Sequence, residues 1–239
     1  MKCILYLFCS LDSLPAELKV LIFARVALAD LARLEQVSRK CNRAVKLTMQ
    51  QKKRLDLNKL YVSQQKCSGS DYHAFAVWVL SRVSRSLTHL QARSSGSRTN
   101  DERILQLIAQ NCPGLIVLDL CYCLVDDTTV LSTLSELRCV DLRSATLTDQ
   151  SVCDLFAHCA RLEEVILGCC KTLTGNCLQR VSQLQNSSSS SLACLNSLTV
   201  CSCFGARQTQ LRAFLRANSR TLGIFEQQQQ QQQQSQSPQ

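Results

Sequence analysis

The sequence predicts an α/β fold in which three short N-terminal helices precede a solenoid of alternating short parallel strands and helices. Two observations support this prediction: an apolar template recurs along residues 87–200, and apolar residues at helical spacing fill the segments between its copies. With 239 residues, 46% of them hydrophobic, and only 7 Gly and 3 Pro, the chain can bury a core and is neither collagen-like nor disordered overall. No stretch approaches the roughly 18 consecutive apolar residues that a membrane-spanning helix needs.

The recurring template is L-x-x-L-x-L, with other aliphatic residues allowed. Its copies start at Leu87, Leu115, Leu137, Leu162 and Leu195. Alternation predicts a strand whose leucines point inward and whose third and fifth residues lie on the opposite face. The spacing fits a repeat of about 20–29 residues, except before the last copy, where a polar run at 186–191 should loop out.

Helices are predicted between the strands. After a cap at Thr148 or Asp149, apolar residues at 152, 155, 156 and 159 fall on one helical face, and similar patterns follow 99–102 and 174–176. One strand and one helix per repeat would stack into a curved solenoid with the strands on its concave face. A terminal helix is expected at 208–217.

The front of the chain has its own helical pattern. The first helix should start at Leu14-Pro15, because proline is tolerated in a first turn. Its apolar face should contain Leu18, Leu21, Ile22 and Val26 or Phe23. A second helix is expected near Asp30–Val37 and a third through residues 41–47. So small a module needs a neighbouring domain or a partner to cover its apolar surface.

These motifs resemble two known families. Leu14-Pro15-Ala16-Glu17-Leu18, Ile22-Phe23, Asp30-Leu31, Arg33-Leu34 and Val37-Ser38-Arg39-Lys40 look like an F-box. Cys123, Cys170 and Cys203 each stand three residues after a template, which resembles the cysteine-containing leucine-rich repeat. This order of motifs is similar to the F-box and leucine-rich-repeat family, over roughly residues 11–217.

The resemblance implies a domain organisation with five parts. We expect an N-terminal extension at 1–10, an F-box at 11–47, a helical linker at 48–86, leucine-rich repeats with a terminal helix at 87–225, and a disordered Gln-rich tail at 226–239.

The resemblance also implies a function without catalysis. The F-box would dock the Skp-type adaptor of a Skp–cullin–F-box ubiquitin ligase, and through it a cullin, while the repeats hold a protein substrate for ubiquitin-dependent degradation. No cofactor or metal is expected, and the location would be cytoplasmic, nuclear or both. The residues expected to contact the adaptor are Leu14, Pro15, Ile22, Leu31, Leu34 and Val37.

The residues themselves do not indicate an enzyme. The three His lie in no nucleophile motif, and there is no P-loop or G-x-S-x-G. Paired cysteines such as Cys121/Cys123 lack the repeated two-to-four-residue spacing of zinc sites.

Charge is distributed unevenly. Residues 1–60 carry twelve Lys/Arg against five Asp/Glu, whereas residues 115–186 carry five against nine, which favours two parts with different partners over a nucleic-acid binder. Strand alternation predicts that Asp119, Asp141 and Ile166 form one row on the concave face. The residues expected to contact substrate are Val117, Asp119, Asp141, Arg143, Glu164 and Ile166, an acidic set that favours a substrate with a basic segment.

Two alternatives stay open. The chain could be a leucine-rich-repeat scaffold with a non-functional F-box, or, given its 16 cysteines, a secreted disulfide-bonded receptor. The start of the chain, with one Lys and then only the seven apolar residues Cys3–Cys9 in a row, favours the absence of a signal peptide. We therefore expect the cysteines of the repeats to be buried, reduced and free of metal.

Overall fold

The fold was analysed in a computed structural model, which describes residues 11–57, 69–83, 86–92, 98–123, 131–170, 172–174, 176–177, 180 and 194–201. The helices are α2 (Ala16–Phe23), α3 (Leu28–Glu35), α4 (Arg39–Gln50), α6 (Gly69–Leu80), α7 (Arg98–Asn111) and α8 (Asp149–His158), with a 3-10 turn η1 (Leu131–Thr133). The strands are β1 (Arg54–Asp56), β2 (His89–Gln91), β3 (Val117–Asp119), β4 (Cys139–Asp141), β5 (Glu164–Gly168) and β6 (Ser197–Cys201).

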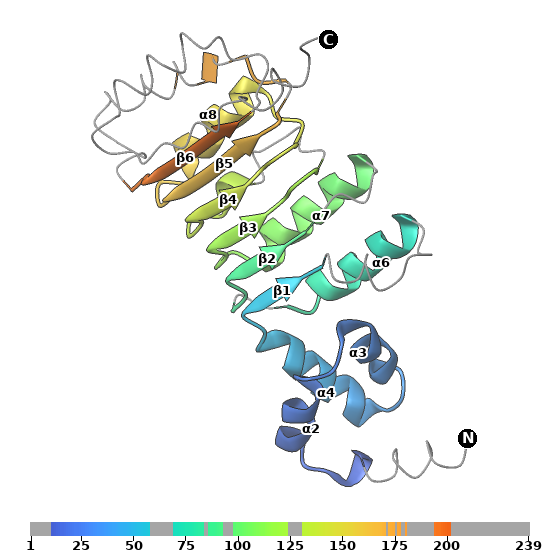
Figure 1. The fold of residues 1–239 in the computed structure, drawn as a ribbon. Coiled ribbons are helices and arrows are strands. Elements are labelled where there is room, and N and C mark those ends of the chain that lie inside the picture. Colours follow the sequence, from blue (N-terminus) through green and yellow to red (C-terminus); the bar gives the residue numbers. More distant parts are fainter. Residues whose placement is uncertain are drawn as a thin grey trace, which may run out of the picture.

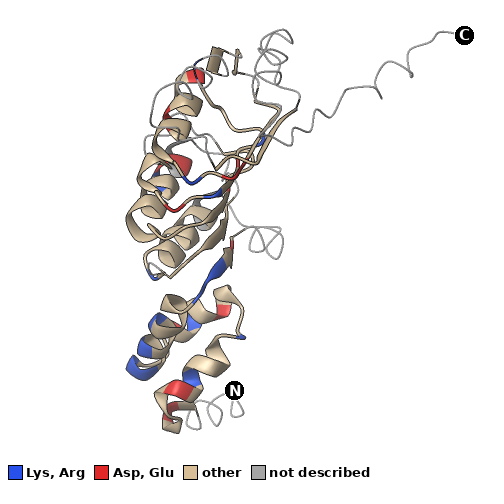
Figure 2. Ribbon diagram, turned by 90° about the vertical axis from the view of Figure 1, so that its left-hand side faces the viewer, with Lys and Arg blue, Asp and Glu red and all other residues tan. Residues whose placement is uncertain are grey.

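The strands form one parallel sheet of six, in the order in which they occur along the chain (Figure 1). Helices α6, α7 and α8 lie on one side of this sheet, and no described helix covers the other side (Figure 2). The three helices of the front module pack together below the first strand (Figure 1). The α/β fold class is therefore confirmed, and it is consistent with a leucine-rich-repeat-like solenoid.

All five copies of the template form strands in the expected register. The fourth position of each copy pairs with the fourth position of the next, from Leu90 through Leu118, Val140 and Val165 to Leu198. All five side chains are buried. We call this stack of five aliphatic side chains the buried ladder. It lies in the core of the solenoid because these positions face the helices.

The sheet begins one strand earlier than the sequence predicts. Segment 48–86, expected as a helical linker, contains β1 and α6, and β1 pairs in parallel with β2 through Leu55 and Leu90. Residues 52–57 follow the template with Leu55 and Leu57 in its last two apolar positions, but its first position is Lys52. The template does not detect this copy because a cation replaces the first leucine.

A repeated turn ends the strands. Tyr122, Ser144 and Cys169 occupy the same position of successive repeats, and each has a positive φ, between 57° and 65°. The residue that follows is buried in every case: Cys123, Ala145 or Cys170. The left-handed residue reverses the chain and points its successor into the core.

The turn cysteines bind the preceding repeat. The thiol of Cys123 donates to the carbonyl of Ala92 at 3.6 Å, and the thiol of Cys170 to the carbonyl of Leu142 at 3.4 Å. Both carbonyls belong to the last template residue of a preceding repeat. The cysteines are thus buried thiols with a structural role, as predicted, while Cys203 lies outside the described residues.

Two of the helices predicted between the strands are confirmed with small changes, whereas most of the helix expected after 174–176 lies outside the described residues. Thr148 caps α8, because its hydroxyl accepts a hydrogen bond from the amide of Ser151 at 3.1 Å. Helix α7 starts at Arg98, so residues 99–102 lie inside it and not before it. The expected terminal helix, the polar loop and the Gln-rich tail lie outside the described residues.

Candidate functional site

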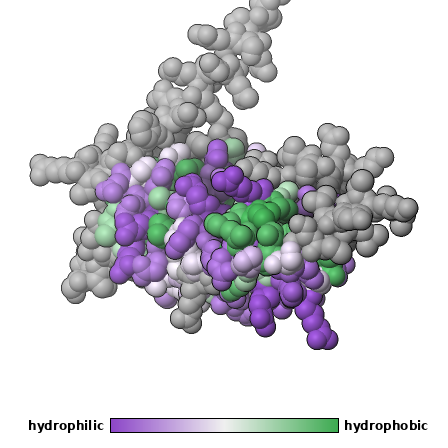
Figure 3. All heavy atoms as spheres, turned by 90° about the horizontal axis from the view of Figure 1, so that it is seen from below, coloured by the Kyte–Doolittle hydropathy of each residue, from purple (hydrophilic) through white to green (hydrophobic). Residues whose placement is uncertain are grey.

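The front module exposes a cluster of large apolar side chains. Five of the six exposed large apolar residues in the described part of the chain belong to it, and they lie on α2, after α3 and on α4: Leu18, Leu21, Ile22, Val37 and Leu47. Seen from the end of the molecule that this module forms, a compact apolar patch faces solvent (Figure 3). An exposed apolar patch of this kind indicates a protein-binding surface.

The residues predicted to contact the adaptor divide into two groups. Pro15, Ile22 and Val37 are exposed and Leu14 is partly exposed, so all four are accessible to a partner. Leu31 is fully buried in the core, and Leu34 packs against that core while remaining partly exposed. Leu31 is therefore not accessible to a partner in this structure, because it is fully buried on α3, the helix that packs against α4.

Leu18 and Leu21, which were expected on the apolar face of the first helix, are exposed. The buried face of α2 contains Phe23, which was one of the candidates, together with Val20 and Lys19. The ammonium group of Lys19 donates to the carbonyl of Asp12 at 3.1 Å. Apolar residues surround nearly the whole of this helix, so its periodicity could not identify the inner face. An apolar residue on every side was itself the signal that some apolar side chains of this helix would remain exposed.

The open face of the sheet brings together the six residues predicted to contact substrate. Asp119, Asp141 and Ile166 are register partners on adjacent strands, as predicted. Val117 and Glu164 lie in the neighbouring row, on either side of Cys139. Arg143 follows β4 and is exposed. These side chains alternate with the buried ladder and therefore face away from the helices.

The acidic character of this face is weaker than the sequence suggests. The guanidinium group of Arg143 binds the carboxylate of Asp141 in a two-pronged ion pair, with a shortest N–O distance of 2.7 Å. The same carboxylate accepts a hydrogen bond from the amide of Arg143 at 3.1 Å. Asp119 and Glu164 form no ion pair with a described residue, so they are the acidic groups still available to a basic ligand.

Asp119, Cys121 and Asp141 place potential metal-ligand atoms within 4.8 Å of one another. Burial, followed by the adjacent Asp119, raises the pKa of the Cys121 thiol to about 12. One Asp119 oxygen accepts from the amide of Cys121 at 3.0 Å, and Asp141 already binds Arg143. These contacts explain why the three side chains lie close together: they are polar groups at the ends of β3 and β4 that bind one another and Arg143.

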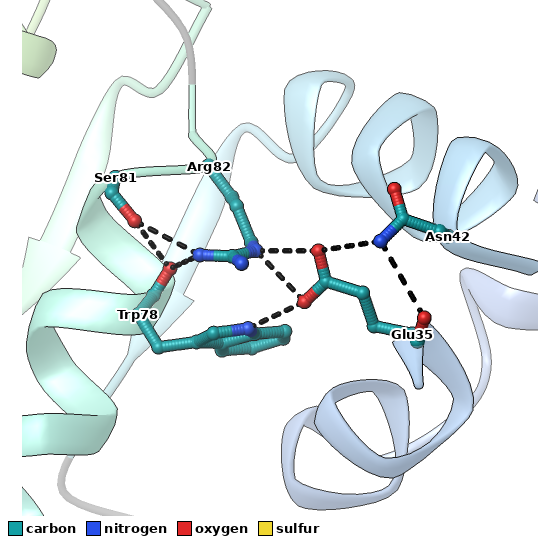
Figure 4. A network of polar contacts seen from close by, with 5 residues as sticks. All are labelled: Glu35, Asn42, Trp78, Ser81 and Arg82. Carbon is teal, nitrogen blue, oxygen red and sulfur yellow. Dashed lines mark hydrogen bonds and ion pairs between the residues drawn. The ribbon is translucent and has the colours of Figure 1, made fainter. Parts of the chain in front are cut away.

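A polar network joins the front module to the first solenoid helix (Figure 4). The buried carboxylate of Glu35, on α3, accepts hydrogen bonds from the indole of Trp78 at 2.6 Å and from Arg82 at 2.9 and 3.0 Å. Arg82 also lies over the Trp78 ring, 4.8 Å from its centre. Asn42 donates to the same carboxylate at 3.4 Å. Because the apolar core is also continuous from Phe23 to Leu198, the module is held against the solenoid.

Comparison with known proteins identifies the front module. Residues 11–49 match the model of the F-box domain family. A sequence search of curated proteins finds no match to the chain. Within the described ranges, no helix combines the length and apolar character that crossing a membrane requires. F-box proteins are typically non-catalytic adaptors of Skp–cullin–F-box ubiquitin ligases, and the domain implies binding of a Skp-type adaptor. The chain therefore contains an F-box domain, followed by a leucine-rich-repeat-like solenoid.

Proposed function

We propose that this protein is the substrate-recognition subunit of a Skp–cullin–F-box ubiquitin ligase and has no catalytic activity of its own. The observation that supports this most strongly is the exposed apolar patch on the domain that matches the F-box family. The F-box docks the Skp-type adaptor and, through it, a cullin. The solenoid, with its open sheet face, holds the substrate.

The proposed mechanism is proximity. A substrate bound to the open face stays close to the ubiquitin-charged enzyme of the ligase, so transfer to a substrate lysine takes place at high effective concentration. A rigid connection between the two modules keeps this distance constant. The Glu35–Arg82 pair and the continuous core supply that connection.

The proposed adaptor-binding surface follows the exposures in the structure. It contains Leu14, Pro15, Ile22 and Val37 from the sequence prediction, with Leu18 and Leu21 added and Leu31 removed. Leu34 packs against the core and remains partly exposed, so it is kept as a secondary contact. A few apolar anchors at the centre of an interface carry most of its binding free energy, and Leu21, 65% exposed, is the strongest candidate.

The proposed substrate-binding surface is the open face around Asp119, Asp141 and Glu164, with Val117 and Ile166 as its apolar contacts. A substrate with a basic segment fits this surface best. Since Arg143 neutralises Asp141, the attraction is concentrated at Asp119 and Glu164. The module boundaries remain part of the proposal: an F-box near 11–49 and a solenoid that starts at β1.

The test of adaptor binding is co-purification from cells. Leu21→Glu with Ile22→Glu should abolish capture of the Skp-type adaptor and its cullin, because two charges would enter an apolar interface. Both side chains are exposed, so the fold should survive. Tyr122→Glu, at an exposed aromatic side chain of the solenoid, is the matched control and should retain the adaptor.

A competing function is an interaction scaffold with a non-functional F-box. In that case the unmodified chain would capture partners through the solenoid but no Skp-type adaptor and no cullin. This result would refute the proposed ligase role.

A location in the cytosol, the nucleus or both fits the free thiols of the described cysteines. Labelling of thiols in protein taken directly from cells tests this location.

A further inference from the structure

A groove opens where the F-box meets the start of the open sheet face. Its volume is about 760 Å³, which is within the usual range of ligand-binding pockets. One wall is formed by Val26 and Ala27, in the connection between α2 and α3, and by Leu28, the first residue of α3. The floor is formed by β1, β2 and the first residue of β3, Val117. We call this the junction groove.

The junction groove contains two cations without a partner in the described part of the chain. Lys52 and Arg54 both line it, and neither forms an ion pair with a described residue. Lys52 is partly buried, and this burial lowers the pKa of its ammonium group. A partly buried cation that forms no ion pair with a described residue favours an anionic ligand, which would restore the lost solvation.

His89 adds a third polar group beside Arg54. The two residues are register partners on β1 and β2. The Thr88 hydroxyl donates to the carbonyl of Lys53 at 2.9 Å and lies 2.9 Å from Nδ1 of His89. With its proton committed to that carbonyl, the hydroxyl accepts from Nδ1–H. Nε2 of His89 then carries no proton, so it can only accept a hydrogen bond from a ligand in the groove and does not itself attract a carboxylate.

The register partners of Arg54 form a row across the sheet, and the charge of this row changes from positive to negative along it. It runs through Arg54, His89, Val117, Cys139 and Glu164. Four strand spacings separate Arg54 from Glu164, which is about 19 Å. The face thus has a cationic end at the F-box and an anionic end further along, where Asp119 lies in the next row.

We propose that the junction groove binds a substrate segment in which a carboxylate side chain stands next to an apolar one. The carboxylate meets Arg54 and Lys52, and the apolar side chain lies against Val26 and Leu28. Asp56, which also lines the groove, disfavours a polyanion such as nucleic acid. The proposal depends on the proposed function only in calling the ligand a substrate.

The experiment measures direct binding of synthetic peptides to the full chain, without adaptor. Fluorescein-labelled peptides of about ten residues carry two glutamates flanking two leucines, or the same sequence with lysines in place of the glutamates, or serines in place of the leucines. Only the first should bind in a fluorescence anisotropy titration. Its binding should weaken as salt rises.

The decisive variant is Arg54→Glu, compared with Arg103→Glu, which makes the same charge change at an exposed position of α7. Arg54→Glu should weaken binding of the glutamate peptide at least about tenfold. It should also allow the lysine peptide to bind, because the charge of the groove is reversed. Arg103→Glu should change neither. Lys52→Met should weaken the glutamate peptide without admitting the lysine peptide.

Three results would overturn the proposal: no binding of the glutamate peptide up to about 1 mM, equal binding of all three peptides, or equal losses in the two arginine variants. Binding of the lysine peptide to the Arg54→Glu variant would also show that this variant is folded. Adaptor capture by the same proteins is recorded separately. If the groove does not bind the glutamate peptide but the chain still captures the adaptor, only this inference is refuted. If the unmodified chain does not capture the adaptor, only the ligase role is refuted.

Discussion

Glu35 holds the F-box against the solenoid through a single buried carboxylate, and removing its counter-ion should destabilise the whole chain. The change is Arg82→Met, which keeps most of the aliphatic length of the side chain but removes the guanidinium group. Trp78 and Asn42 would still donate to the carboxylate. Its negative charge would then have no compensating cation among the described residues.

The magnitude follows from burial. The Glu35 side chain is 7% exposed and that of Arg82 is 24% exposed. Breaking a fully buried ion pair from one side costs about 3–5 kcal/mol. Because water still reaches Arg82, we expect a smaller loss, about 2–3 kcal/mol of the free energy of unfolding.

The assay is urea unfolding of the full chain followed by far-UV circular dichroism, with Glu35→Gln, Arg82→Met and the double variant forming a double-mutant cycle. Direct contact predicts a coupling of about 1–2 kcal/mol. The matched control is Arg33→Met, which removes an ion pair to Asp30 whose side chains are 76% and 55% exposed. That variant should cost less than about 0.5 kcal/mol.

The reasoning fails if Arg82→Met costs no more than Arg33→Met, or if the coupling in the cycle is below about 0.5 kcal/mol. A further readout concerns the connection itself. Trp78→Phe should keep the ring beneath Arg82 but lose the hydrogen bond to Glu35, at a cost of about 1.5–3 kcal/mol. An unchanged stability in Trp78→Phe would show that the indole hydrogen bond contributes little.

Four further predictions concern the solenoid. Cys170→Ser should destabilise by about 1–3 kcal/mol in urea unfolding, because the shorter side chain leaves a hydroxyl poorly placed in a fully buried site; an unchanged midpoint would contradict this. Thr148→Ala should cost about 1 kcal/mol through loss of the α8 cap, and equal stability would mean that the cap hydrogen bond contributes nothing. Ser144→Gly should stabilise by about 0.5 kcal/mol, since glycine adopts the observed positive φ without strain; a destabilised variant would contradict this. Asp119→Lys with Glu164→Lys should abolish substrate capture while leaving the adaptor bound, and retained capture would move the substrate away from the open face.

The sequence alone determined the repeat and its register. Each strand requires buried residues at fixed local spacing, so the spacing of the template is enough to align Leu118, Val140 and Val165 with one another. The turn cysteines are predictable for the same reason. Cys123 and Cys170 stand at a constant distance from their strands, and a left-handed residue precedes each of them.

Local spacing did not reveal where the repeat begins or which face of the first helix is buried. Lys52 occupies the first template position of β1, because this strand borders the F-box and not an earlier repeat. On α2, apolar residues at Val20 and at Leu21 are equivalent in the sequence, but only Val20 packs inward. A surface built to bind a partner is as apolar as a core.

The remaining features depend on residues that are distant in the chain. Glu35 and Arg82 are 47 positions apart, and the junction groove combines the α2–α3 connection with three strands. Hydrophobic periodicity specifies what each segment buries, and so it predicted the secondary structure and the register. It carries no information about which polar groups meet when two modules pack, since that depends on their relative position, which only the tertiary structure decides.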